Sequence, residues 1–335
     1  MLTLADEGAS SPRMSSDKDV TAAIPPELSG MVKSAKFRDG VATIIADAGG
    51  LGRSAAAQLQ RELEEAVAAV EGVDEVRVAL MADKVQRQII AVGSGKGGVG
   101  KSTLTTNLAV ALANQGVKVG VVDADIYGPS QPLLLGTANE KVRAEGQTLI
   151  PTESEFGVKV LSMGQLIEPG KAIAWRGPMV GQALAQLMDA DWGDTELLIV
   201  DLPPGTGDVQ LTMLQKFKPA GAVVVSTPQD LALIDATRAI DLFKQAQVPI
   251  VGLVENMAGY LCPECGAISN PFGQGGTEAA AQALGVPFLG RIPLAMEIRV
   301  ASDTGQPPAA NDTEHGPHFA GIAAGLADYL GEAKG

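Results

Sequence analysis

The chain has 335 residues, of which 46% are hydrophobic and 4% aromatic, and its formal net charge is −14. This acidity argues against a nucleic-acid partner or an anionic membrane surface, because both reward an excess of Lys and Arg. No apolar run approaches the ~20 residues of a membrane-spanning helix, and residues 1–26 carry no apolar run typical of a secretory signal, so we expect a cytoplasmic protein with no membrane partner.

The first part of the chain predicts a tail followed by a small domain. Residues 1–16, rich in Ser, predict a disordered tail. Residues 17–82 predict a small α+β domain, with a strand at Val41–Ala46, a helix from an N-capping Ser54 to about Glu71, and a second strand over Val76–Leu80. The polar residues 83–88 predict a linker.

Residues 89–335 predict a larger α/β domain in which short apolar runs alternate with helical segments. The runs are Ile89–Val92, Val119–Val122, Val158–Leu161, Leu197–Val200, Ala222–Val225 and Ile250–Val254. The helices are expected from Lys101 onward and near Met179–Met188, Val209–Gln215, Leu231–Gln245, Thr277–Leu284 and Phe319–Leu330. Strands that are apolar throughout are buried on both faces, so we expect a mostly parallel twisted sheet with helices on both faces.

The first of these strands leads into a glycine-rich loop that matches G-x-x-x-x-G-K-[ST]. Its glycines allow backbone N–H groups to converge on phosphate oxygens, and the following helix N-terminus adds positive potential. The match predicts an ATP site made by Gly95, Lys96, Gly97, Gly98, Val99, Gly100, Lys101, Ser102 and Thr103. We expect Lys101 to reach the β- and γ-phosphates, Ser102 to ligate Mg²⁺, and Thr103 to contact the α-phosphate.

The start of this loop, Gly95–Gly98, also resembles the deviant form of the motif found in the class that includes nitrogenase iron protein, MinD and ParA. In that class a second lysine reaches across a dimer to the partner's nucleotide. The resemblance implies this catalytic role for Lys96, and the alternative is a solvated loop lysine.

Carboxylates follow two of the predicted strands, at the end where α/β sheets bind ligands. Asp123 and Asp125 come after Val119–Val122, and the resemblance implies that Asp125 orients the attacking water while Asp123 assists near the metal; loop capping is the alternative for both. Asp201, after Leu197–Val200, fits the second carboxylate for Mg²⁺.

Two further residues complete the predicted nucleotide site. Gly205 lies four residues after Asp201 and is expected to offer its N–H to the γ-phosphate, so that its loop distinguishes ATP from ADP. Asn256 resembles the asparagine that reads adenine in the same class.

Cys262 and Cys265 are the chain's two cysteines, and the two residues between them make a tight knuckle. Two thiolates do not complete a tetrahedral site, but two chains related by a two-fold axis would supply four. The spacing fits a shared [4Fe–4S] cluster or a shared zinc ion equally well. A catalytic dithiol and an inert pair are the remaining alternatives.

With these motifs the chain resembles the Mrp/ApbC family of P-loop iron–sulfur cluster carriers over nearly its whole length. Besides the phosphate loop and the cysteine pair, the resemblance rests on Asp123–Ser130, Asp201–Asp208, Thr227–Asp235, Glu255–Met257, Asn270–Gly276 and Gly290–Leu294. It implies a homodimeric ATPase that binds a labile [4Fe–4S] cluster between its subunits and passes it to apo-proteins, with scaffold proteins as a second class of partner.

The small domain is similar to one fused to many members of this family. Pro25–Leu28 stands where the family often has Asp-Pro-Glu-Leu, and the domain has no cysteine, so we interpret it as an interaction module. Two rival functions are a MinD/ParA-like positioning or partition ATPase and a zinc-bridged dimeric ATPase. The first needs a basic patch or tail, whereas residues 319–335 hold a single basic residue, Lys334.

Overall fold

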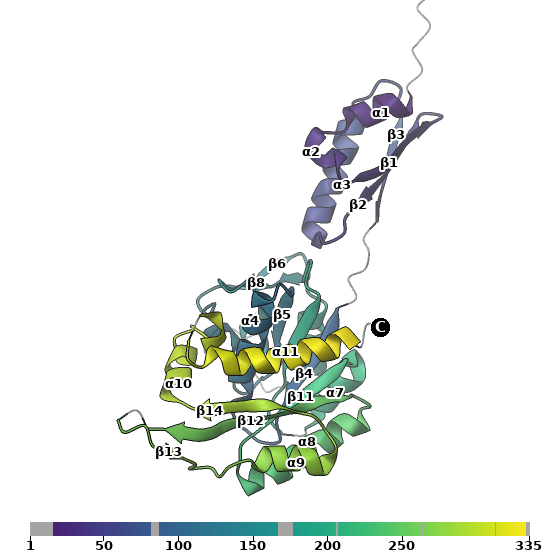
Figure 1. The fold of residues 1–335 in the computed structure, drawn as a ribbon. Helices are drawn as coiled ribbons and strands as arrows, with labels where there is room; N and C mark the ends of the chain where they lie inside the picture. Colours follow the sequence, from purple (N-terminus) through teal and green to yellow (C-terminus); the bar gives the residue numbers. More distant parts are fainter. Residues whose placement is uncertain are drawn as a thin grey trace, which may run out of the picture. The chain divides into compact units, whose positions relative to one another are not determined.

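The chain divides into two compact units, Met1–Val85 and Gln86–Gly335. The computed structural model describes residues 16–81, 87–166, 177–205, 207–262, 264–311 and 313–332 (Figure 1). The predicted tail therefore lies outside the described residues except for Ser16, and the predicted linker except for residues 87 and 88. The smaller unit contains one cluster of buried hydrophobic side chains and the larger unit contains two.

The smaller unit is a three-stranded sheet with helices packed against it. In chain order its elements are α1 (Asp17–Ala23), α2 (Pro26–Ser29), β1 (Val32–Arg38), β2 (Val41–Asp47), α3 (Arg53–Ala68) and β3 (Glu75–Met81). The strand order is β1-β2-β3, with β1 antiparallel and β3 parallel to β2. Val20 of α1, Ile44 of β2 and Leu63 of α3 are fully buried in its core.

Two features of the smaller unit differ from the sequence prediction. Helix α3 begins at Arg53 with Gly52 in the N-cap position, so the predicted N-cap at Ser54 is wrong by two residues. Strand β1 was not predicted, because Lys33, Lys36 and Arg38 give this edge strand an exposed polar side that obscures its apolar alternation.

The larger unit is built on one sheet with the strand order β13-β12-β11-β4-β10-β5-β9-β8, to which β14 adds by pairing with β12. Among the described residues its strands are β4 (Gln88–Gly93), β5 (Val119–Asp123), β8 (Thr152–Glu153), β9 (Lys159–Ser162), β10 (Leu197–Asp201), β11 (Gly221–Ser226), β12 (Ile250–Leu261), β13 (Ile268–Ser269) and β14 (Phe288–Leu294). Only the pairings of β13 with β12 and of β8 with β9 are antiparallel in this sheet, so the predicted, mostly parallel α/β architecture is confirmed.

Helices and short segments connect these strands. They are α4 (Lys101–Asn114), α5 (Gln131–Leu134), the hairpin β6 (Arg143–Glu145) and β7 (Thr148–Ile150), η1 (Met163–Leu166), α6 (Gly177–Met188), α7 (Asp208–Phe217), α8 (Asp230–Gln245), α9 (Gly276–Leu284), α10 (Met296–Asp303), η2 (Pro308–Ala310) and α11 (Gly316–Glu332). No described helix combines the length and the apolar character that crossing a bilayer requires.

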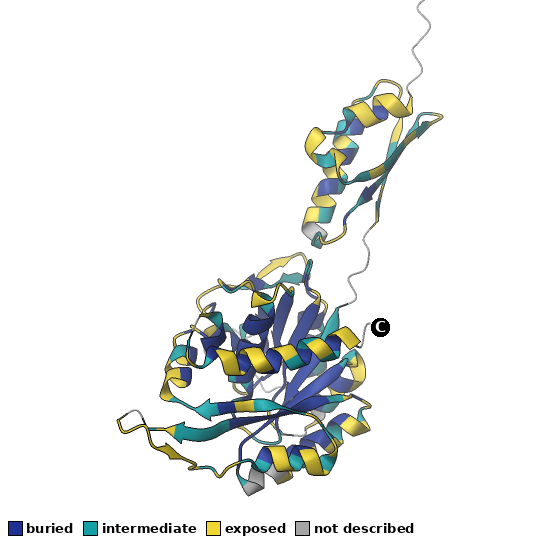
Figure 2. Ribbon diagram, viewed as in Figure 1, coloured by how far each residue is buried: buried dark blue, intermediate teal, exposed yellow. Residues whose placement is uncertain are grey.

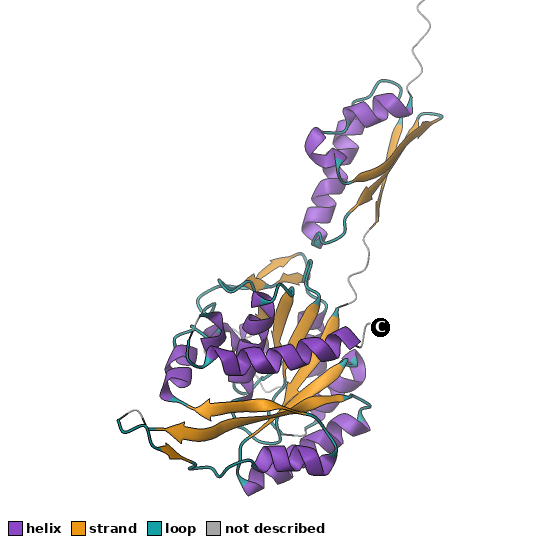
Figure 3. Cartoon of the chain, in the orientation of Figure 1, coloured by secondary structure: helices purple, strands orange, loops and turns teal. Residues whose placement is uncertain are grey.

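The apolar strands divide their side chains between two cores, one on each face of the sheet. In β10, Leu197 and Ile199 pack on the face covered by α4 and α11, whereas Leu198 and Val200 pack on the opposite face with residues of α6, α7, α8 and α9. This alternation follows from the two-residue period of a strand. The central strands are accordingly buried between helical layers (Figures 2 and 3).

The topology brings the ends of three neighbouring strands together. β10 lies between β4 and β5, and in both pairings the register places Asp201 at the strand end, opposite Val92 of β4 and Asp123 of β5. Because these strands are parallel, the loops that follow them emerge at the same edge of the sheet. This edge carries most of the residues that the sequence singled out.

Candidate functional site

The glycine-rich loop links β4 to α4, and its conformation depends on several glycines. Gly98 and Gly100 are left-handed, with φ of +77° and +82°. A Cβ on Gly100 would lie 2.0 Å from Nδ2 of Asn256, and one on Gly95 would lie 2.0 Å from the backbone oxygen of Asp235 in α8. The loop is therefore packed closely against α8 at Gly95 and against Asn256 of β12 (Ile250–Leu261) at Gly100, where a Cβ would not fit.

A cleft of about 250 Å³ opens over this loop. Its lining residues are Ser94, Lys96, Gly97, Gly98, Gly100, Lys101, Ser102, Thr103, Asp125 and Pro204. The cleft thus brings together most of the predicted loop residues and the predicted water-orienting Asp125. Gly95, Val99, Asp123, Asp201, Gly205 and Asn256 do not line it.

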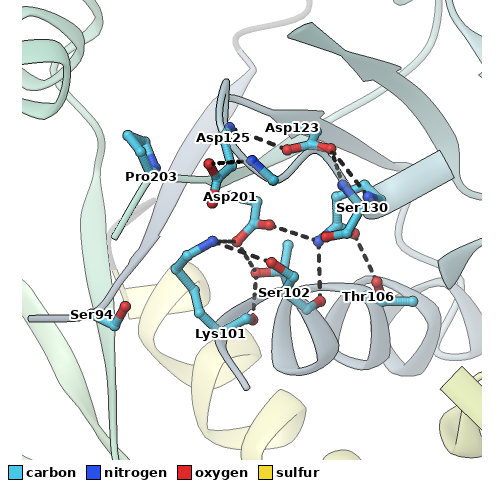
Figure 4. A network of polar contacts seen from close by, with 12 residues as sticks. Ser94, Lys101, Ser102, Thr106, Asp123, Asp125, Ser130, Asp201 and Pro203 are labelled. Carbon is cyan, nitrogen blue, oxygen red and sulfur yellow. Dashed lines mark hydrogen bonds and ion pairs between the residues drawn. The ribbon is translucent and has the colours of Figure 1, made fainter. Parts of the chain in front are cut away.

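Lys101 and Asp201 form a buried ion pair beneath the cleft (Figure 4). Lys101 Nζ donates to Asp201 Oδ1 and, at 3.3 Å, to Ser102 Oγ. Thr105 Oγ1 lies 3.1 Å from the same Asp201 oxygen. The lysine therefore lies next to Ser102 and Asp201, two of the residues predicted at the Mg²⁺ site, and neutralises a carboxylate that has no exposure to solvent.

Asp123 is also fully buried, and four donors hold its two oxygens (Figure 4). Oδ2 accepts from the backbone N–H groups of Ser130 and Gln131 at 2.9 and 3.1 Å and from Ser162 Oγ at 2.9 Å, while Oδ1 accepts from Asp125 N at 3.2 Å. Burial first, and then the negative charge of Asp201, raise the pKa of Asp123 to about 7. In this structure Asp123 fixes the loop after β5; its predicted role near the metal stays a prediction.

Asp125 faces the cleft from that loop. Its Oδ1 accepts from the backbone N–H groups of Tyr127 and Gly128, both at 3.1 Å, which closes a tight turn. The other carboxylate oxygen takes no part in these two bonds, and the side chain lines the cleft. The position suits a water-orienting carboxylate, which stays a prediction.

Lys96 lines the cleft beside the first half of the loop. Its Nζ donates to Gln229 Oε1 at 3.1 Å, just before α8. Its backbone oxygen accepts from Ser94 Oγ at 2.9 Å. The side chain is half-buried, so this lysine is held by its own chain rather than extended into solvent.

Gly205 and Asn256 contact the glycine-rich loop from outside the cleft. The Gly205 N–H donates to the Ser94 backbone oxygen at 3.0 Å, and Gly205 is left-handed at φ +91°. Asn256 Nδ2 donates to the Val99 backbone oxygen at 2.8 Å. The predicted contact of Gly205 with a γ-phosphate therefore requires its N–H to leave Ser94.

The cysteine pair lies at the end of a short hairpin formed by β12 and β13. Cys262 follows directly on β12 and is half-buried, whereas Cys265 is exposed. The Cys262 N–H donates to Ala267 O at 3.0 Å, and its own oxygen accepts from Gly266 N at 2.9 Å. Hydrogen bonds from the backbone of Cys265 and then of Glu264 hold the pKa of the Cys262 thiol below its ordinary value, with a smaller effect from the Cys265 side chain.

The two thiols have no third metal ligand from their own chain among the residues that the structure describes. No group of three or more His, Cys, Asp or Glu side chains gathers anywhere in those residues. A four-ligand metal site at the hairpin would therefore need ligands from outside the described residues of this chain.

Sequence reasoning missed several residues that hold this site together. Gln131, Thr105, Thr106 and Ser162 all donate or accept within the network around Asp123 and Asp201. Thr105 and Thr106 lie two and three residues after Thr103, the last residue of the predicted phosphate loop, and that proximity is the one signal that could have found them. Gln131 and Ser162 lie in other segments with no motif of their own.

Comparison with known proteins agrees with this geometry. Residues 85–327 match the ParA family, described as NUBPL iron-transfer P-loop NTPases. The chain is 45% identical to an iron–sulfur cluster carrier protein of Pseudomonas fragi over 75% of this chain and 92% of that protein. It is 50% identical to a mitochondrial iron–sulfur protein of Arabidopsis thaliana required for NADH dehydrogenase, over 66% of this chain and 71% of that protein.

One similar solved structure is a nucleotide-binding protein from Archaeoglobus fulgidus in complex with ADP. It is 40% identical to this chain, with a TM-score of 0.58 over 65% of this chain and 86% of that one. The resemblance to P-loop iron–sulfur cluster carriers is therefore confirmed, and the chain belongs to the ParA family of NUBPL-type iron-transfer P-loop NTPases.

Proposed function

We propose that this chain is a Mg²⁺-dependent ATPase that carries an iron–sulfur cluster between two of its subunits and delivers it to apo-proteins. The observation that carries the proposal is that one strand, β12, connects the two sites. Asn256 of β12 donates to the phosphate loop at Val99, and Cys262 follows the end of the same strand.

The nucleotide half of the proposal is supported by the cleft. Backbone N–H groups of the glycine-rich loop, the N-terminus of α4 and the Lys101 ammonium group concentrate positive potential there, as an anionic phosphate requires. The family name and the ADP bound to the Archaeoglobus fulgidus protein support a nucleotide as the ligand.

The donor set below the cleft fits Mg²⁺. The Ser102 hydroxyl and the Asp201 carboxylate are oxygen donors that share Lys101 Nζ as a hydrogen-bond partner, and Mg²⁺ prefers oxygen ligands. When bound, this ion neutralises charge on the transferred phosphoryl group. Binding of Mg²⁺ together with ATP would transfer the Lys101 ammonium group from Asp201 to the phosphates. Asp125 would then orient the attacking water.

The cargo half of the proposal is supported by the hairpin. Two thiols from each of two subunits would complete the four thiolates of a [4Fe–4S] cluster. The lowered pKa of Cys262 favours the thiolate that binds iron. A site divided between two chains can be opened by subunit movement, which suits a protein that must release its cargo.

Coupling between the two halves would follow β12. Residues 251–256 are buried in the sheet, whereas residues 257–260 are half-buried as the strand leaves it. Met257, the first half-buried residue after this buried part, has a left-handed backbone with φ +61°. A movement of the phosphate loop against Asn256 would therefore act on β12 just before the half-buried part that leads to Cys262.

Reciprocal variants test this function. Wild-type protein reconstituted anaerobically with ferrous iron and sulfide should give a brown dimer with about four iron atoms, by the cluster's stoichiometry. Cys262→Ala should stay colourless and still bind ATP, whereas Lys101→Ala should load the cluster and bind ATP at least about tenfold more weakly, because it loses charge-assisted hydrogen bonds.

Lys118→Ala is the matched control for the lysine variant, because Lys118 is exposed and lies away from the cleft. It should behave as wild type in both assays. Transfer is read by the return of activity in an apo-enzyme that needs a [4Fe–4S] cluster, and Lys101→Ala should transfer poorly. Wild-type protein that binds zinc and forms no coloured cluster would replace this function with the zinc-bridged dimer, and a monomer without bound iron would contradict both.

A further inference from the structure

Gln131 lies at the centre of the network under the cleft, although no motif contains it. It is the first residue of α5, directly after the loop that carries Asp125, and it has no exposure to solvent. Its amide Nε2 lies 2.9 Å from Asp201 Oδ2 and 3.0 Å from the Ser102 backbone oxygen. Its Oε1 accepts from Thr106 Oγ1 at 2.7 Å.

The chemistry of these partners fixes the orientation of the amide. The Asp201 carboxylate, paired with Lys101, and the Ser102 carbonyl act as hydrogen-bond acceptors here, so the amide nitrogen must face both. The Thr106 hydroxyl then donates to the amide oxygen on the other side. Every polar atom of the Gln131 side chain therefore has a partner in one arrangement only.

Gln131 also supplies a hydrogen bond to Asp201 Oδ2, which Lys101 and Thr105 do not contact. Lys101 and Thr105 both contact Oδ1, whereas the amide of Gln131 contacts Oδ2. With contacts on both oxygens, the carboxylate plane is fixed. Without the amide, Oδ2 would be buried with no donor in place of Nε2, and the carboxylate could rotate about its bond to Cβ.

The backbone of Gln131 ties the same residue to the loop after β5. Its N–H donates to Asp123 Oδ2 at 3.1 Å, next to the bond from Ser130. Asp123 in turn accepts from Asp125 N at 3.2 Å. One residue thus connects the Asp201 carboxylate, the first turn of α4 at Ser102, and the loop that presents Asp125 to the cleft.

We infer that Gln131 is a positioning residue that orients Asp201 for Mg²⁺ and sets the loop of Asp125 relative to it. The inference rests on the proposed binding of Mg²⁺ and ATP in the cleft. Gln131 makes no contact with the cleft itself, so it acts through Asp201 and Ser102. Its loss should weaken the response to Mg²⁺ and leave Mg²⁺-free nucleotide binding unchanged.

The test compares the full-length wild type with Gln131→Met, which keeps the side chain's length and removes both hydrogen-bonding ends. Nucleotide affinity is measured in EDTA and across a Mg²⁺ titration, and turnover is measured over the same titration. We expect the affinity in EDTA to stay within about twofold of wild type. The half-saturating Mg²⁺ concentration should rise, and saturated turnover should fall, by about tenfold or more, as is usual when an outer-shell partner of a metal ligand is lost.

Two further variants sharpen the result. Thr106→Val keeps Gln131 and removes the hydroxyl that orients it, so it should raise the half-saturating Mg²⁺ concentration by a smaller factor than Gln131→Met, because Thr106 contacts Gln131 and not the metal ligand itself. Gln115→Met changes an exposed glutamine beyond the end of α4 and should match wild type. If Gln131→Met does not fold, the Mg²⁺ titration of Thr106→Val decides whether Gln131 is a positioning residue.

The outcomes separate this inference from the proposed function. A wild-type protein that neither binds nor hydrolyses ATP with Mg²⁺ would end the proposed function. A wild type that does both, with unchanged Mg²⁺ dependence in Gln131→Met and Thr106→Val, would overturn the role of Gln131 alone. Equal losses of affinity with and without Mg²⁺ would also overturn it, because they would indicate a general structural defect.

Discussion

At the scale of single residues, two carboxylates at neighbouring strand ends have opposite surroundings. Asp201 and Asp123 are register partners in β10 and β5, and both are fully buried. Asp201 has Lys101 as a counter-ion, whereas Asp123 has only neutral donors and the charge of Asp201 nearby. The same residue type therefore serves as a lysine-paired candidate metal ligand in one strand and as a loop anchor with a raised pKa in the other.

A residue-scale prediction concerns the reactivity of Cys262. In Cys265→Ser, Cys262 is the only thiol of the chain, and the backbone donors of residues 264 and 265 that lower its pKa remain. We expect the rate of alkylation by iodoacetamide to rise with pH, with a midpoint below that of an ordinary thiol at about 8.5.

The same variant unfolded in urea is the control for this measurement, because unfolding removes the backbone donors and leaves the sequence unchanged. Its alkylation midpoint should return to the ordinary value. An identical midpoint in the folded and unfolded protein would show that the hairpin does not stabilise the thiolate.

The candidate site was predictable where a residue belongs to a contiguous motif and hidden where its role depends on the fold. Lys101, Ser102 and Asp125 line the cleft, and their predicted roles stay predictions. The bond of Gln131 to Asp201 joins residues 70 positions apart, and no spacing along the chain indicates it. The hydrogen bond from Gly205 to Ser94 could likewise not be predicted from the sequence, because it joins backbone atoms and depends on no particular side chain.

At the scale of elements, the phosphate loop depends on its contact with α8. A Cβ on Gly95 would lie 2.0 Å from the Asp235 backbone oxygen, and a helix backbone cannot yield as a side chain can. Gly95→Ala should therefore displace the loop, weaken ATP binding by about tenfold or more, and lower the free energy of unfolding by about 1–3 kcal/mol, the usual cost of overpacking.

Gly321→Ala is the control, because a Cβ there meets nothing within 4 Å on the exposed side of α11. It should be neutral or slightly stabilising, since alanine restricts the unfolded chain. Equilibrium urea unfolding and a nucleotide titration provide both measurements. Wild-type behaviour of Gly95→Ala would show that α8 does not constrain the loop.

Sequence patterns identified the elements that the core dictates. The apolar runs that became β4, β5, β10 and β11 are buried along nearly their whole length, so their pattern is unbroken. β14 escaped prediction because Gly290, Arg291 and Pro293 interrupt its pattern, and it forms by pairing with β12. Such an edge strand is specified by its neighbour more than by its own residues.

At the scale of the whole molecule, the two units have separate cores. The two cores of the larger unit are formed by residues from Ile89 onward, and the core of the smaller unit by residues from Val20 to Leu80. A chain of residues 86–335 should therefore fold, bind ATP within about twofold of the full-length affinity, and load the cluster, as expected for an autonomous domain.

Size-exclusion chromatography, nucleotide titration and iron analysis of this shortened chain test the prediction. Slower transfer to acceptors with normal loading would support the interpretation of the small domain as an interaction module. An insoluble product, or one that no longer binds nucleotide, would show that the larger unit needs the smaller one.

The Gly205 N–H has one proton and, under the proposed function, two competing acceptors. While it donates to Ser94, the loop after β10 is fastened to the residue immediately before Gly95. If the γ-phosphate accepted this hydrogen bond, the bond between Gly205 and Ser94 would break and the two loops would separate. A diphosphate has no γ-phosphate and would leave the loops joined. A single backbone amide would then distinguish ATP from ADP. Because the acceptor at Ser94 is its backbone oxygen, a side-chain substitution there would not abolish this distinction.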